Sequence, residues 1–405
     1  MMLSKNIKNV YSDIRGDIYM KALELERKGE KVLKLNTGNP AAFGFKMPQS
    51  IKNRIMTDVE RALGYCDIRG LEEARTAIKN YHHTKGLHNI TQEDIFIGNG
   101  VSEVAYMIIT ALICENDEVL VPSPCYSLWT NFTYLAGGKV KFYQCDELNG
   151  WQPDVESIKK GITKNTKALV LINPNNPTGA LYSKEILLEI IDVARKNNLV
   201  IISDEIYDRL VLDEKKHIST ASLADDVTVI TMNGLSKSHC ICGLRCGWLC
   251  ISGMEKNKKI LADALVKIAS VRLCSNALMQ IIIPDALADT AYTENMIGPN
   301  GRILRQRNAV AEELDKIEGI SYVKNSAAFY LFPKINLKKF GLKNDREFAE
   351  KLLAEKHILV IPGSGFNCAD ENHFRIVMLP EETELRNAIK SINLFLNKDK
   401  NSFYA

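Results

Sequence analysis

The sequence predicts an α/β fold in which a large, mostly parallel sheet is covered by helices and a smaller α+β domain is attached. Short β-branched runs alternate with helical patterns through the middle of the chain, and these runs are apolar almost throughout. Apolar strands that alternate with helices are typical of a parallel sheet with both faces covered. A chain of 405 residues also exceeds one ordinary core, so a second domain is expected.

The large domain is expected to contain six strands with helices between them. The strands are residues 118–123, 139–145, 167–173, 199–205, 227–233 and 247–252. Helices are expected at 102–114 and 184–196. A mostly helical stretch then runs from Gly253 to about residue 289, and Pro284 is expected to break it.

Elements from both ends of the chain are expected to form the smaller domain. They are helices at 18–28 and 301–314, strands at 329–335, 358–363 and 373–378, and a closing helix from about Glu382. Because no Pro-, Gly- or Ser-rich linker is present, we expect the domains to share a long helix rather than a flexible tether. The expected division is residues 1–48 as an N-terminal arm and part of the small domain, 49–290 as the large domain, and 291–405 as the small C-terminal domain.

Composition argues against several classes of protein. The formal net charge of +3 is small for this length, so no nucleic-acid partner is expected. No apolar run approaches the roughly 20 residues that span a bilayer, and the polar start lacks a secretory signal, so we expect no membrane contact and a cytoplasmic location. The ten cysteines are expected to be reduced, and the spacing of the four from Cys240 to Cys250 is not that of a zinc site, so no metal is expected.

Lys237 and its neighbours form the first group with a chemical interpretation. A lysine after small residues at a strand end is usually solvated, but here Arg245 follows eight positions later. A loop that turns back would bring both side chains to one phosphate, which a guanidinium binds bidentately, and Ser236 would add a hydroxyl donor. The GNGVSE segment (98–103) would offer backbone N–H groups at a helix N-terminus, although a lone glycine motif is a weak signal.

Asp204 follows an apolar strand, where a carboxylate is costly without a cation or donors. One interpretation is a helix cap or strand-end turn, and the other is an ion pair with a protonated ring nitrogen. Tyr207, and Asn176 in the turn-rich segment 173–179, could reach a ring oxygen. With an imine-forming Lys237, these residues suit pyridoxal phosphate, which stabilises a carbanion only while its ring nitrogen is protonated. They all follow strands, at the end of a parallel sheet where ligands collect.

Arg375 lies in an apolar strand, where an arginine is unfavourable unless it is paired. We expect it to bind the α-carboxylate of a substrate, with a structural salt bridge as the alternative. Gly38, in the segment NTGNP, could let the backbone approach the same carboxylate.

From IRGD (14–17) to HFRIVMLP (373–380), the chain resembles the fold-type I, class I aminotransferases, which use pyridoxal phosphate. The resemblance implies an aspartate aminotransferase-like fold with a seven-stranded sheet, in which residues 49–290 bind the cofactor. It implies Lys237 as the imine lysine, Asp204 as the partner of the ring nitrogen, Tyr207 and Asn176 as partners of the ring oxygen, Tyr126 as the stacked aromatic, and Val101, Ser102, Ser236 and Arg245 as phosphate contacts. It also implies a cis peptide bond before Pro177, and a homodimer in which Tyr65 reaches the neighbouring subunit's phosphate.

Within that family, passages such as VLKLNTGNPAAFGF (32–45) and LINPNNPTGALYSKE (171–185) resemble the bacterial alanine (glutamate–pyruvate) transaminase branch. The implied reaction converts L-alanine and 2-oxoglutarate into pyruvate and L-glutamate by a ping-pong mechanism. Gly38, Asn176 and Arg375 would bind the amino acid. Arg15 is a candidate for the side-chain carboxylate of glutamate, against a surface salt bridge. Two departures are the cysteines of SHCICG (238–243), where the branch usually has an arginine and small residues, and Gly234, where many relatives carry a phosphate-binding serine.

Other reactions with the same cofactor remain alternatives. They are transamination of aromatic, branched or aspartate substrates and a β-lyase reaction, because side-chain pockets are built from scattered residues. A regulator that uses this fold as an effector sensor would carry an added DNA-binding domain. The residues before Asn39 contain neither a helix-turn-helix nor a basic patch.

Overall fold

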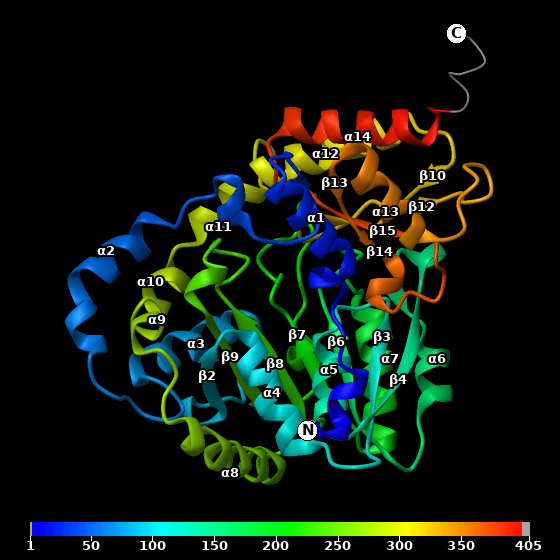
Figure 1. Cartoon of the computed structure of the whole chain (residues 1–405). Coiled ribbons are helices and arrows are strands. Elements are labelled where there is room, and N and C mark those ends of the chain that lie inside the picture. Colours follow the sequence, from blue (N-terminus) through cyan, green and yellow to red (C-terminus); the bar gives the residue numbers. More distant parts are fainter. Residues whose placement is uncertain (1, 399–405) are drawn as a thin grey trace.

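The computed structural model describes residues 2–398 and contains one large sheet between layers of helices (Figure 1). Its strands are β2 (Ile95–Asn99), β3 (Glu118–Ser123), β4 (Lys139–Asp146), β5 (Gln152–Pro153), β6 (Thr166–Ile172), β7 (Val200–Asp204), β8 (Val229–Gly234) and β9 (Cys246–Ser252), in the order β2-β9-β8-β7-β6-β3-β4-β5. β3, β4, β6, β7 and β8 pair in parallel, whereas β9 is antiparallel to both neighbours. The six expected strands are confirmed. With β2 they make the expected seven, and the two-residue β5 adds an antiparallel edge.

The inner strands are apolar because both faces of the sheet are buried there, whereas β4, near the edge, has mostly exposed side chains. In β6, Leu169 and Leu171 enter one hydrophobic core, whereas Val170 and Ile172 enter another, as the alternation of side chains along a strand requires. The first core is closed by α3 (Glu72–Thr84), α6 (Val155–Gly161) and α7 (Lys184–Asn197), and the second by α4 (Val101–Leu112), α5 (Leu128–Leu135) and α8 (Glu255–Arg272). α4 and α7 confirm the helices expected at 102–114 and 184–196.

A third hydrophobic core joins the two ends of the chain. The N-terminal α1 (Asp17–Arg27) packs there with α12 (Arg302–Leu314), α13 (Asp345–Lys356) and α14 (Glu382–Leu396). β1 (Leu33–Lys34) pairs with β13 (Ile358–Leu359), β10 (Ile320–Ser321) with β12 (Lys334–Ile335), and β15 (Phe374–Val377) lies between β11 (Tyr330–Leu331) and β14 (Ile361–Pro362). Figure 1 shows α12 and α14 at the end of the molecule opposite α8.

The helical stretch after Gly253 differs from the expectation. It ends first at Leu273, whose φ of 68° is outside the helical region, and Asn276 caps the short α9 (Ala277–Ile281). Pro284 lies in the first turn of α10 (Ile283–Ala288), where a proline costs no helical hydrogen bond. α11 (Thr290–Ile297) and Gly298–Gly301 then precede α12, so the long helix expected between the domains is not present.

The prediction of a cis peptide bond before Pro177 is also wrong. In the described chain the cis bonds precede Pro124 and Pro174. Within residues 2–398, no helix combines the length and the apolar character needed to cross a bilayer.

Candidate active site

A cavity of ≈ 660 Å³ lies at the carboxyl ends of β6, β7 and β8, between the large sheet and β11 and β15. It brings together every site residue predicted from the sequence except Tyr65: Arg15, Gly38, Val101, Ser102, Tyr126, Asn176, Asp204, Tyr207, Ser236, Lys237, Arg245 and Arg375. Tyr65 lies outside the cavity and its side chain faces solvent, 85% exposed. The residues that line the cavity come from segments more than 300 positions apart, so only the folded chain assembles it.

Lys237 follows β8 and projects its amine into the cavity. Its Nζ donates a hydrogen bond of 2.8 Å to the carbonyl oxygen of Gly38 and lies 6.0 Å from the centre of the Phe329 ring. In the described chain Lys237 forms no salt bridge, so its nitrogen is available to a ligand. Ser236, immediately before it, is buried and lines the same cavity.

Asp204 ends β7 with its carboxylate almost fully buried, 7% exposed. Its Oδ1 accepts a 3.3 Å hydrogen bond from the amide of Ile206, and no salt bridge to it exists among residues 2–398. Burial raises the pKa of Asp204 from 3.8 to about 6, opposed by the Ile206 amide, the Trp129 indole and the charge of Lys237. A buried carboxylate without a cation is unfavourable, and a protonated ring nitrogen would relieve that cost.

Arg375 projects from β15 and is 1% exposed. Its Nη1 donates a 2.8 Å hydrogen bond to Oδ1 of Asn176, and its Nη2 donates to the carbonyl of Asn36. The guanidinium carbon lies 4.5 Å from the centre of the Tyr330 ring and 4.7 Å from that of Phe366. Nε of Arg375 has no hydrogen-bond partner, and no acidic residue of the described chain pairs with this arginine. The alternative of a structural salt bridge therefore finds no partner here, and the arginine is free to bind a carboxylate.

The start of α4 lies at the cavity. Gly100 precedes the helix and provides no side-chain cap, so the N–H groups of Val101 and Ser102, two residues that line the cavity, have no capping side chain to compete with a ligand. Arg245, held at φ 59°, donates from Nη1 to the carbonyl of Cys242 at 3.1 Å and from Nη2 to that of Asn99 at 3.2 Å. A Cβ at Gly100 would clash with this guanidinium, so the close approach requires glycine.

Gly234, the position at which many relatives carry a serine, is closed to any side chain. It pairs with Gly247 across β8 and β9, and a Cβ there would lie 2.5 Å from the carbonyl oxygen of Cys246. The cysteines of 238–243 diverge in environment: Cys240 is buried against Met296, whereas Cys242 lines the cavity and donates to Oδ1 of Asn39. Among the described residues no group of three or more His, Cys, Asp or Glu side chains is arranged to hold a metal ion, and all ten cysteines are free thiols.

The charges of the cavity are strongly one-sided. Four cations, Arg15, Lys237, Arg245 and Arg375, line it, against the single carboxylate of Asp204. Such a cavity attracts a ligand that carries several negative charges, as a phosphate ester and a carboxylic acid do together.

Tyr330 is the main site residue that the sequence did not reveal. Its hydroxyl lies 2.7 Å from that of Tyr207, and both side chains are buried. Tyr330 reaches the cavity because β11 pairs with β15, with Tyr330 opposite Val377. That register cannot be read from two residues of strand, although an aromatic hydroxyl in the apolar run 329–335 was a visible signal.

Comparison with known proteins identifies the family. The family model described as "Aminotransferase class I and II" matches residues 30–392. The chain belongs to the class I and II aminotransferases. Glutamate-pyruvate aminotransferase AlaA of Haemophilus influenzae is 45% identical to it over 394 residues, which is 97% of this chain and 98% of that protein.

Solved aminotransferase structures share the fold over nearly the whole chain. An aminotransferase from Escherichia coli has a TM-score of 0.96 at 43% identity, covering 98% of both chains. Alanine aminotransferase from Pyrococcus furiosus has a TM-score of 0.93 at 38% identity, covering 98% of this chain and 100% of that one. The predicted family and fold class are therefore confirmed.

Proposed function

We propose that this chain is a pyridoxal-phosphate-dependent aminotransferase that interconverts L-alanine plus 2-oxoglutarate with pyruvate plus L-glutamate. The observation that carries the proposal is that Lys237 shares one cavity with Asp204, a buried carboxylate lacking a cation, and Arg375, a buried cation lacking an acid in the described chain. A protonated ring nitrogen would pair with Asp204, and the carboxylate of an amino acid would pair with Arg375. The choice of substrates is supported by relatives called glutamate-pyruvate aminotransferase and alanine aminotransferase.

The residues of the cavity fit this cofactor. Asp204 would pair with the ring nitrogen, and Tyr126 would stack on the ring. The ring oxygen would be held by Tyr207 and Asn176, and the phosphate by Val101, Ser102, Ser236 and Arg245. When bound, pyridoxal phosphate supplies an electron sink for negative charge at the substrate Cα.

Lys237 is the proposed proton carrier. At rest its amine would hold the cofactor, and an incoming amino acid would free it. Nζ would then remove the proton from the substrate Cα, while the Asp204 carboxylate keeps the ring nitrogen protonated. Because the donor and the acceptor use the same cavity, they would bind in turn, in ping-pong order.

Two arginines would recognise the substrates. Arg375, with Asn176 and the backbone at Gly38, would bind the α-carboxylate shared by all amino and oxo acids. Arg15 is exposed on the rim of the same cavity and has no salt bridge within residues 2–398. We assign it to the second carboxylate of glutamate and 2-oxoglutarate, which alanine and pyruvate do not have.

The proposal extends to assembly and organisation. The exposed ring of Tyr65 would reach the phosphate of a neighbouring subunit, so the enzyme would be a homodimer. We also assign the enzyme to the cytoplasm. We divide the chain at 1–48, 49–290 and 291–405. The core that α1 shares with α12, α13 and α14 supports assigning the N-terminal arm to the small domain.

A half-reaction screen tests the proposal. Purified protein is loaded with pyridoxal phosphate, mixed with single amino acids, and followed by the absorption of the bound cofactor. Alanine and glutamate are expected to discharge the band fastest. A preference for tyrosine, leucine or aspartate would replace the substrate pair by one of the alternative transaminations. Release of pyruvate and ammonia from a cysteine conjugate would indicate a β-lyase. No cofactor band in the wild-type protein would overturn the proposal altogether.

A further inference from the structure

We propose that Tyr330 is a positioning residue that ties the proposed cofactor contact, Tyr207, to the proposed carboxylate-binding arginine, Arg375. The inference rests on the proposed function and adds a residue that none of its roles includes. Tyr330 would act through its neighbours: its hydroxyl would orient Tyr207 and its ring would orient Arg375.

The hydroxyl contact crosses the cavity between two sheets. Tyr207 follows β7 of the large sheet, whereas Tyr330 belongs to β11 of the three-stranded sheet. Their oxygens are 2.7 Å apart, and the side chains are 2% and 1% exposed, so water does not compete for the bond. If Tyr207 gives its proton to the ring oxygen, Tyr330 must be the donor in this pair. A hydrogen bond received by Tyr207 strengthens the one that it gives.

The ring contact fixes the arginine. The Arg375 guanidinium contacts two rings, with its carbon 4.5 Å from the centre of Tyr330 and 4.7 Å from that of Phe366. Aromatic rings attract a cation without neutralising it, so they hold the guanidinium in place and leave its charge for an anion. β11 and β15 are paired neighbours, which keeps Tyr330 and Arg375 in register.

Space around the Tyr330 hydroxyl is closed by the segment that contacts Lys237. A Cβ at Gly38 would clash with this hydroxyl, and the carbonyl of Gly38 accepts the hydrogen bond from Lys237 Nζ. Tyr330 therefore lies against three parts of the site, and its two functions occupy different parts of one side chain. Substitutions can separate them.

Two substitutions at Tyr330 divide the roles. Tyr330→Phe keeps the ring on Arg375 and removes only the bond to Tyr207, whereas Tyr330→Leu removes the ring as well. Phe366→Leu, the matched control, removes the other ring that contacts Arg375, and Phe366 has no hydroxyl to offer Tyr207. Each protein is loaded with pyridoxal phosphate. The pH midpoint of the absorption of the bound cofactor is measured, together with the dissociation constant for 2-methylalanine, an amino acid without a proton at Cα. Thermal unfolding verifies that each variant is folded.

Tyr330→Phe is expected to raise the pH midpoint by a few tenths of a unit, because a weaker bond from Tyr207 lets the cofactor hold its proton to higher pH, and to leave 2-methylalanine binding within about twofold. Tyr330→Leu is expected to move the midpoint as Tyr330→Phe does and also to weaken 2-methylalanine several-fold. Phe366→Leu is expected to weaken 2-methylalanine several-fold and leave the midpoint unchanged. The inference is overturned if Tyr330→Phe does not move the midpoint, if Phe366→Leu moves it as far, or if Tyr330→Leu binds 2-methylalanine as tightly as Tyr330→Phe does. Failure of the wild-type protein to take up the cofactor would instead refute the proposed function.

Discussion

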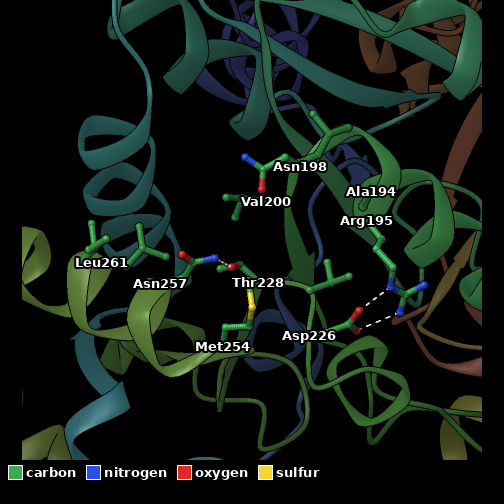
Figure 2. A pocket seen from close by; sticks show the side chains of 12 residues that line it. Ala194, Arg195, Asn198, Val200, Asp226, Thr228, Met254, Asn257 and Leu261 are labelled. Atoms are coloured by element: carbon green, nitrogen blue, oxygen red, sulfur yellow. Dashed lines mark hydrogen bonds and ion pairs between the residues drawn. The ribbon is translucent and has the colours of Figure 1, made fainter.

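A second cavity, of ≈ 400 Å³, lies at the amino ends of the strands β7 and β8 whose carboxyl ends carry the site, and its charges are arranged differently (Figure 2). There Arg195 is paired with Asp226, through Nε to Oδ2 at 2.5 Å and Nη2 to Oδ1 at 2.9 Å. Asn257 donates to the hydroxyl of Thr228 at 3.0 Å. In the active-site cavity, by contrast, Arg375 and Lys237 have no acidic partner in the described chain.

The difference shows which end of the sheet is prepared for a ligand. At the amino end an arginine and a carboxylate satisfy each other, partly in solvent, and leave little for a third group to gain. At the carboxyl end a buried carboxylate and a buried guanidinium lie in one cavity without being paired with each other. That arrangement is unfavourable in the empty protein and becomes favourable when a ligand brings charges of both signs.

The comparison is broken most severely at Lys237. Lys237→Ala is expected to lower transaminase turnover by at least about 10³-fold. It removes both the amine that would hold the cofactor covalently and the group that would take the proton from the substrate Cα. The steady-state rate with alanine and 2-oxoglutarate measures the loss. Lys164→Ala, at an exposed lysine, is the control and should retain wild-type turnover. Normal turnover by Lys237→Ala would contradict the assigned role.

Arg375→Leu is expected to lower kcat/KM for alanine by about 10²-fold or more, since it removes the buried cation that would pair with the α-carboxylate of the substrate. The effect should be common to alanine, glutamate and pyruvate, because all present the same α-carboxylate.

Arg15→Leu should instead weaken the binding of glutamate and 2-oxoglutarate selectively, because only these two substrates carry a second carboxylate. Equal losses for alanine and glutamate in Arg15→Leu would remove Arg15 from the specificity argument.

Asp204→Asn sharpens the comparison through stability. The pKa of Asp204 is raised from 3.8 to about 6 in the folded protein, so folding is favoured while the carboxyl is protonated and this contribution is lost as pH rises through about 6. Without cofactor, the unfolding free energy of the wild type should therefore fall relative to that of Asp204→Asn between about pH 4 and pH 6, by about 3 kcal/mol at most. Denaturant unfolding across this range measures the gap. A gap independent of pH would mean that Asp204 is not titrating as its burial requires.

The smallest effect is expected at the amino-end cavity. Arg195→Leu breaks an ion pair whose side chains are 43% and 53% exposed, so its cost should stay within about 1 kcal/mol. Activity with alanine should remain within about twofold of the wild type. A large loss of activity would show that the two ends of the sheet are coupled, contrary to the comparison.

The sequence revealed the site residues whose type and neighbours indicate a role, Arg375 included, and missed Tyr330, whose role depends on long-range register. Lys237 and Asn176 follow apolar strands and Asp204 ends one, and parallel strands bring such positions together. Tyr330 escaped notice because its strand is only two residues long and its partner is Val377. The same limit explains the helix after Gly253, where Leu273 and Asn276 set the boundaries more strongly than Pro284 does.

The core shared by α1 and α14 has a consequence for synthesis of the protein on the ribosome. Ile18 and Ala22 belong to the same core as Leu385 and Ile389, and α1 contacts α13 and β13, so the first α-helix to emerge buries its apolar side only after these C-terminal elements have been made. The large sheet is complete by Ser252, long before that moment. A nascent chain would therefore contain the proposed cofactor contacts of the large sheet before Arg375 had been made. Premature termination between these points would leave a molecule with the proposed cofactor contacts but without the proposed binding group for the substrate carboxylate.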